Sequence, residues 1–169
     1  MIAALSFVGT VVGLYVEVVP VVSVSPPSSG SSSQDPFTKP FVVNNEDSFS
    51  VYSVKATCGF PAGIEGVTKS GGTTLEPGKP AGAEADFRFD SFSTDELESQ
   101  EHRPFTCGTI SNITLSGQFG SLSRCWVTII VEFKPIKFIP RFSSHKFSFE
   151  AGPQEDGYFH WSEIPLGPG

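Results

Sequence analysis

An all-β fold is predicted by three features of the sequence. Apolar and polar residues alternate along several short stretches, which is the period of a strand with one buried face. Glycine and proline, 17 and 14 of 169 residues, separate these stretches at intervals of roughly ten residues. Beyond the N-terminal segment, no long stretch carries the 3.6-residue apolar period of an amphipathic helix.

The most regular stretch is Arg124–Glu150, which predicts a long antiparallel hairpin at the centre of a sheet. Its second half places Phe147 and Phe149 on one face, and Pro135 and Pro140 mark a turn between the two halves. Its first half places five apolar residues on one face: Cys125, Val127, Ile129, Val131 and Phe133.

Further strands are expected along the rest of the chain. In Phe49–Cys58, Tyr52, Val54, Ala56 and Cys58 share one face, whereas Ser91–Glu101 is expected to be a loop or one helical turn. This spacing is typical of a sandwich, so we predict an immunoglobulin-like antiparallel β-sandwich over residues 21–169. The other expected strands start near Val21 and at Phe41–Val43, Thr73–Leu75, Ala83–Asp90, Arg103–Cys107, Ile110–Leu115 and Tyr158–Ile164.

The N-terminal segment predicts a transmembrane anchor helix over residues 1–20. Met1–Val16 is apolar and uncharged, and Glu17 and Pro20 interrupt the run, so the helix is expected to end near Val16–Val19. A cleaved signal peptide is the first alternative, although no Lys or Arg precedes the run and no A-x-A site follows it. A buried valine-rich strand is the second.

Charge argues against nucleic acid as a partner. The chain has 11 basic and 18 acidic residues and a net charge of −7, whereas binding to phosphate backbones needs cationic surface. The expected partners are the membrane, through the N-terminal helix, and another envelope protein as a candidate. No cofactor is expected.

Three cysteines allow at most one internal disulfide. Cys58, Cys107 and Cys125 all fall on the apolar face of expected strands. In an exported domain we favour Cys58–Cys107, which would close a loop of roughly 50 residues and contribute roughly 4 kcal/mol by chain entropy. Cys107–Cys125 is the alternative pairing, and three buried thiols in a cytosolic domain is the alternative state.

The turn of the central hairpin is the one local concentration of positive charge. Lys134, Lys137 and Arg141 lie there beside Phe138, and together with Trp161 they are the candidate residues for contact with a ligand, a partner or lipid headgroups. The alternative for the basic residues is gatekeeper charges that prevent edge pairing, and for Trp161 it is packing over the core.

No catalytic residue and no metal ligand is assigned from the sequence. His102, His145 and His160 are scattered, and a metal site needs three or four converging ligands. The alternative function is an envelope hydrolase or metal-dependent enzyme with its site in the 84–102 region, using Asp90, Asp95, Glu96 or the histidines.

Seven segments carry a further pattern: Val22–Pro26, Asp35–Phe37, Phe41–Asn44, Tyr52–Cys58, Val131–Pro140, Lys146–Phe149 and Asp156–Leu166. Together, at these spacings, they resemble a group of small, uncharacterised bacterial proteins with one N-terminal transmembrane helix and an exported β-sandwich domain. The resemblance departs at Phe133, where tyrosine is expected, and at Glu17–Pro20. It implies an extracytoplasmic domain anchored in a bacterial envelope, without implying an activity. We therefore expect a non-enzymatic binding or structural domain.

Overall fold

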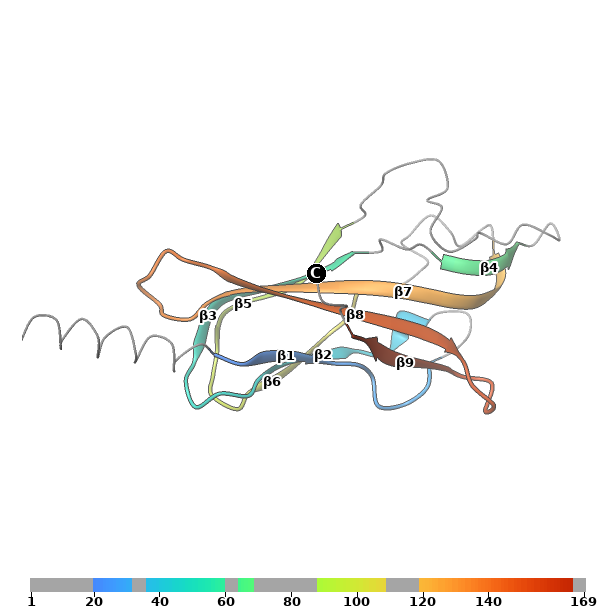
Figure 1. The fold of residues 1–169 in the computed structure, drawn as a ribbon, viewed down its shortest axis with the longest axis horizontal. Helices are drawn as coiled ribbons and strands as arrows, with labels where there is room; N and C mark the ends of the chain where they lie inside the picture. Colours follow the sequence, from blue (N-terminus) through green and yellow to red (C-terminus); the bar gives the residue numbers. More distant parts are fainter. Residues whose placement is uncertain (1–19, 32–35, 60–63, 69–87, 109–118, 166–169) are drawn as a thin grey trace, which may run out of the picture.

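The described chain is all-β, as predicted. The computed structural model describes residues 20–31, 36–59, 64–68, 88–108 and 119–165, and within them the strands form two antiparallel sheets (Figure 1). A short 3-10 helix, η1, covers Pro36–Thr38. The strands are β1 (Val22–Ser25), β2 (Phe41–Asn45), β3 (Val51–Gly59), β4 (Ile64–Thr68), β5 (Arg88–Leu97), β6 (His102–Phe105), β7 (Phe119–Lys134), β8 (Ser143–Pro153) and β9 (Phe159–Ile164).

The long hairpin predicted at the centre of a sheet is β7–β8. The larger sheet has the strand order β5-β3-β7-β8-β9, with β4 also paired to β7, and the smaller sheet has the order β1-β2-β6. The β7–β8 ladder runs from Cys125 opposite Ala151 to Phe133 opposite Ser143. Because β3 pairs with the other edge of β7, the hairpin lies inside the larger sheet, as the alternation predicted.

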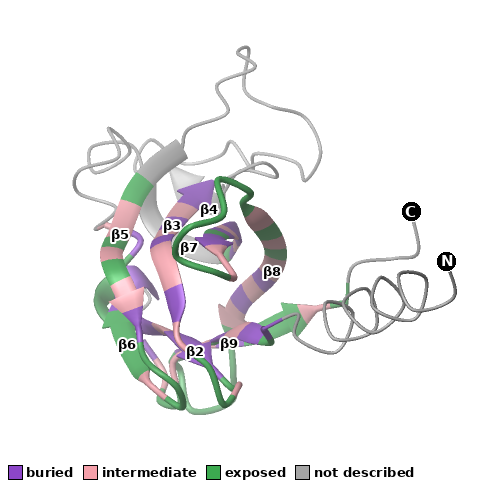
Figure 2. Cartoon of the chain, turned by 90° about the vertical axis from the view of Figure 1, so that its left-hand side faces the viewer, coloured by how far each residue is buried: buried purple, intermediate pink, exposed green. Residues whose placement is uncertain are grey.

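The core lies between the two sheets, and β7 contributes to it the apolar face that the alternation predicted. All five apolar residues of that face, from Cys125 to Phe133, are at most 1% exposed. From the smaller sheet, the ring of Phe41 packs 5.3 Å from Phe149 and 5.1 Å from Trp161, between ring centroids. Figure 2 shows the alternation as bands of burial along the strands, with buried stretches on β3 and β7.

A β-bulge near the start of β3 makes the predicted buried face wrong at Tyr52. Tyr52 was expected on the buried face, but Val51 is fully buried and Tyr52 only half-buried. Ser53 adopts a positive φ of 50°, and the register with β7 shifts between Tyr52 and Lys55. The extra residue reverses the side-chain alternation, and from Val54 onward the predicted face is correct.

The prediction of a loop or one helical turn over Ser91–Glu101 is wrong up to Leu97, because β5 continues to that residue. This strand lies at the edge of the larger sheet, where its backbone pairs with β3 while polar side chains such as Ser93 and Asp95 stay exposed. An edge strand needs no strict apolar alternation. The strand β4, Ile64–Thr68, is not among the expected strands.

Other expectations fall outside the described residues. These include the strands at 73–75 and 110–115, most of the strand at 83–90, and the anchor helix over residues 1–20 apart from Pro20. Within the described part of the chain, no helix is long and apolar enough to cross a bilayer.

A disulfide joins the two sheets with the favoured pairing. Cys58 lies in β3 of the larger sheet and Cys107 follows β6 of the smaller one, with their Cα atoms 5.6 Å apart. Cys125 is buried on β7 outside this bond, so the alternative Cys107–Cys125 pairing is wrong. The bond closes a span of 49 positions and, by chain entropy, is worth about 4 kcal/mol.

The packing of Phe41 yields a prediction for stability. Phe41→Ala should lower the free energy of unfolding by about 3–5 kcal/mol, because the ring is fully buried and fills the space between the sheets. Denaturant unfolding measures the change. Phe49→Ala removes the same side chain from a position that is 55% exposed, and it should cost less than about 0.5 kcal/mol. Equal losses in both variants would contradict the described core.

Candidate partner-contact surface at the hairpin tip

The hairpin tip, residues 134–142, is the turn that joins β7 to β8. The ladder between the two strands ends at Phe133 and Ser143, and the backbone N–H of Ile139 donates to the carbonyl of Ile136 at 3.2 Å to form the turn. Pro135 and Pro140 have no backbone N–H, so neither could donate to a longer ladder. In Figure 1 the tip projects along the long axis beyond the neighbouring β2–β3 and β5–β6 turns.

Apolar side chains are exposed on the tip. Four of the seven large hydrophobic residues that are exposed in the described chain lie there. Their exposed fractions are 89% for Phe138, 53% for Phe142, 39% for Ile136 and 36% for Ile139. Exposed apolar residues that cluster on one projection, instead of lying scattered, are typical of an interaction site.

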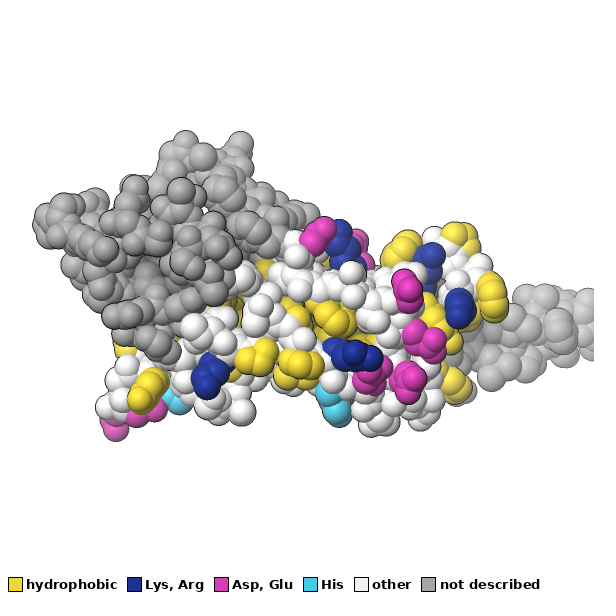
Figure 3. Space-filling model, turned by 180° about the vertical axis from the view of Figure 1, so that it is seen from behind, with side chains coloured by type: hydrophobic (Ala, Val, Ile, Leu, Met, Phe, Trp, Pro, Cys, Tyr) yellow, Lys and Arg dark blue, Asp and Glu magenta, His cyan; other side chains and the backbone are white. Residues whose placement is uncertain are grey.

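Basic side chains surround these apolar ones, as Figure 3 shows at the end of the molecule. The ammonium nitrogen of Lys134 lies 4.9 Å from the ring centroid of Phe142, and that of Lys137 lies 5.5 Å from that of Tyr52. Arg141 is exposed. The structure therefore brings together Lys134, Lys137, Phe138 and Arg141, the candidate contact residues of the hairpin. Contact with a partner stays a prediction.

Trp161, the fifth candidate, lies apart from the tip and within the core. The residue is 7% exposed, and its ring centroid lies 5.1 Å from that of Phe37. Its indole N–H donates to the carbonyl of Pro36 at 3.0 Å. These contacts correspond to the alternative interpretation, in which Trp161 packs over the core.

The chain enters the domain at the same end as the tip. The carbonyl of Val22 lies 3.3 Å from Nδ1 of His145, near the start of β8, and that of Val21 accepts from the N–H of Glu46. From there β1 runs away from the tip, since Ser31 bridges to Phe159 at the other end of β8. Figure 1 shows the start of β1 on the side of the hairpin turn.

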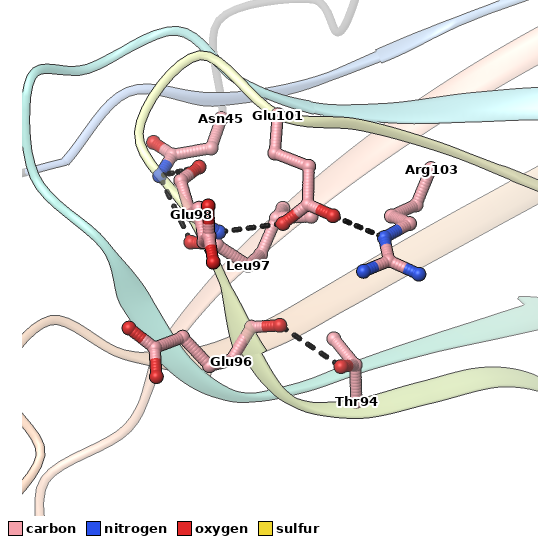
Figure 4. A network of polar contacts seen from close by, with 7 residues as sticks. All are labelled: Asn45, Thr94, Glu96, Leu97, Glu98, Glu101 and Arg103. Carbon is pink, nitrogen blue, oxygen red and sulfur yellow. Dashed lines mark hydrogen bonds and ion pairs between the residues drawn. The ribbon is translucent and has the colours of Figure 1, made fainter.

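A polar network fixes the two turns beside the tip (Figure 4). In Figure 4 the amide nitrogen of Asn45 donates to the carbonyls of Leu97 at 3.2 Å and Glu98 at 2.9 Å. The same nitrogen also donates to the carbonyl of Phe49 at 2.7 Å. Asn45 is fully buried. One side chain thus satisfies carbonyls from both the β2–β3 and the β5–β6 turns, and sequence alternation gives no sign of this role.

Glu101 extends the same network. Its carboxylate accepts from the backbone N–H of Glu98 at 2.7 Å and from Nε of Arg103. The Glu98 N–H, followed by the Arg103 guanidinium, lowers the pKa of Glu101 below its usual value of 4.5. The ionised carboxylate therefore stabilises the β5–β6 turn.

The histidines and acidic residues considered for catalysis lie apart from one another and make structural contacts. His102 bonds to Asn44 at 2.9 Å and His160 to Asp156 at 2.8 Å. The Tyr158 N–H and then His160 lower the pKa of Asp156. No group of three metal-ligating side chains occurs among the described residues.

The 84–102 region contributes to an open depression between β3 and β5. Asp95 lines it together with Ser53, Lys55, Ser93 and Thr94. Asp90 pairs with Lys55 at 2.9 Å, at an exposed position. Glu96 lies opposite Tyr52 in the ladder, so the three acidic candidates follow the edge strand at separate positions.

Comparison with protein-family models, with curated proteins and with solved structures finds no match to this chain.

Asn45 yields a prediction for the turns beside the tip. Asn45→Ala should lower the free energy of unfolding by about 2–3 kcal/mol, because one buried carbonyl, that of Leu97, and two part-buried ones lose their donor. Chemical denaturation measures the loss. Ser99→Ala also removes a bridge between the two turns, since Ser99 Oγ donates to the carbonyl of Asp47, but that bridge is exposed and should cost about 0.5 kcal/mol or less. A larger loss from the Ser99 variant would contradict the central role of Asn45.

Glu101 yields a prediction for acid. Because its pKa is lowered in the folded state, its contribution to stability is fully present above its usual pKa of 4.5 and is lost as the pH falls through the folded value. Glu101→Gln should therefore be less stable than the wild type near neutral pH, and the difference should shrink below pH 4.5. Unfolding curves over a pH series test this. Arg103→Gln leaves the Glu98 donor in place and should give an intermediate effect; a gap that widens in acid would contradict the assignment.

Proposed function

We propose that this chain is a membrane-anchored, non-enzymatic domain of a bacterial envelope with a binding or structural role. Residues 1–20 serve as the anchor, and an immunoglobulin-like β-sandwich over residues 21–169 lies on the extracytoplasmic side. The apolar, uncharged Met1–Val16 supports the anchor. The resemblance to small anchored envelope proteins supports the extracytoplasmic location of the domain.

The inter-sheet disulfide carries the proposal. Disulfides persist in oxidising compartments and are rare in the cytosol of most bacteria. Cys58–Cys107 links the two sheets at the core, since both residues are at most 2% exposed. A bond in this position supports a structural role and an exported domain.

A binding role is supported by the hairpin tip. The apolar and basic side chains of the tip lie outside the core. The three histidines, in contrast, make polar contacts with residues of the sandwich itself. The candidate acidic residues likewise lie along an edge strand, where Asp90 is paired with Lys55. These contacts favour binding through the tip over catalysis in the 84–102 region.

Thiol counting on fractionated membranes tests the proposal. Full-length protein expressed in a bacterial host should stay with the membrane through alkaline carbonate extraction. After denaturation, a maleimide reagent should modify one thiol without reductant and three with it. Cys125→Ala is the control and should show no thiol without reductant. Three thiols without reductant, or release of the protein into the soluble fraction, would overturn the proposed extracytoplasmic, membrane-anchored location.

A further inference from the structure

We propose that the hairpin tip inserts into the headgroup region of the bilayer that holds the anchor, so that the domain contacts its own membrane a second time. This inference rests on the proposed function, because it takes residues 1–20 as the anchor. It identifies the partner of the tip as a lipid surface with anionic headgroups.

The chemistry of the tip fits this boundary. Phe138 and Phe142 present apolar rings, with Ile136 and Ile139 beside them, and such side chains bury favourably at the junction of headgroups and acyl chains. Lys134, Lys137 and Arg141 carry positive charge around them. Basic residues at this depth interact with lipid phosphates, and anionic lipids strengthen the attraction.

The geometry also allows the contact. Val22 contacts His145, which pairs with Val131, so the three residues lie at one level of the hairpin. With the rise per residue of a β-strand, the turn of the hairpin extends roughly 10–15 Å beyond that level. The anchor is expected to end near Val16–Val19, and the intervening chain can span at most roughly 10–20 Å. The tip and the end of the anchor are thus within reach of the same surface.

Acidic residues at this end restrict the contact to the tip. Glu46 and Asp47 in the β2–β3 turn, and Glu98 and Glu101 in the β5–β6 turn, lie behind the projecting hairpin. Within the fold, Glu46 accepts from Ser23 and Glu101 from Arg103. Anionic headgroups would repel these turns, so approach is favourable only for the basic, apolar projection.

A fluorescent probe at the tip tests the inference. In full-length Phe138→Cys, an NBD probe should react at position 138 only, because Cys125 is buried and the other cysteines are bonded. The protein is reconstituted into vesicles of phosphatidylethanolamine and phosphatidylglycerol that contain a lipid with a nitroxide high on its acyl chain. Tyr158→Cys is the matched control, since Tyr158 is an exposed aromatic residue (54%) in the β8–β9 turn at the other end.

The expected result is a loss of NBD fluorescence at position 138 and none at position 158. Flotation in a density gradient shows whether the protein is bound to the vesicles. If it is bound but neither position is quenched, the second contact is absent and the inference fails, while the anchor stands. If the protein does not float, the proposed anchor itself fails. Shielding of position 138 from a water-soluble quencher in native membranes, without quenching in the lipid vesicles, would assign the tip to a protein partner and overturn the inference.

A charge variant tests the lipid chemistry. Replacing Lys134, Lys137 and Arg141 by Gln should reduce the quenching at position 138 in the anionic vesicles towards the level in pure phosphatidylcholine. Lys39→Gln is the control. Lys39 is exposed and precedes the start of β2, whereas the end of β2, at Asn45, is the part that lies near the tip. Unchanged quenching in the triple variant would contradict the role of anionic headgroups.

Discussion

The rest of the structure depends on the pairing of β7 on both of its edges. One edge pairs with β4 at the start of the strand and with β3 from Thr128 onward, and the other edge pairs with β8 from Cys125 to Phe133. From Thr128 to Phe133 the strand is therefore paired on both edges. Its inward face from Cys125 to Phe133 is then available to form one wall of the core. The smaller sheet can close over that wall because Phe41 fills the gap and the Cys58–Cys107 bond ties the sheets together.

The same constraint explains why the candidate surface lies where it does. The ladders end at the Phe133–Ser143 pair of β7 and β8 and at the Tyr52–Lys134 pair of β3 and β7. Among the described residues no strand pairs with the hairpin beyond these positions, so its apolar side chains extend past the sheet. A two-stranded projection is only marginally stable alone. The Lys134–Phe142 contact lies within the tip, and the Lys137–Tyr52 contact joins the tip to β3, while Phe138 remains almost fully exposed.

Sequence alone predicted what depends on strong local periodicity. The alternation of β7, the hairpin and the grouping of Lys134, Lys137, Phe138 and Arg141 follow from neighbouring residues. The alternation also placed all three cysteines on buried faces, which allowed the Cys58–Cys107 bond without selecting it over Cys107–Cys125. What sequence could not show depends on distant partners. The bulge at Ser53 is defined against β7, and the edge strand β5 is held by backbone pairing to β3. Two of the three carbonyls that Asn45 bonds, those of Leu97 and Glu98, lie 52 and 53 positions away.

The two proposed membrane contacts together would define the orientation of the domain. A single tether leaves a domain free to rotate, whereas a tether and a tip at the same end restrict it. Because β1 and β8 both run from that end towards Phe159, the strands would stand away from the bilayer. The β8–β9 turn, with exposed Tyr158 and the Asp156–His160 pair, would then face the compartment. A second protein would therefore meet that far end first, since the tip would be occupied by lipid.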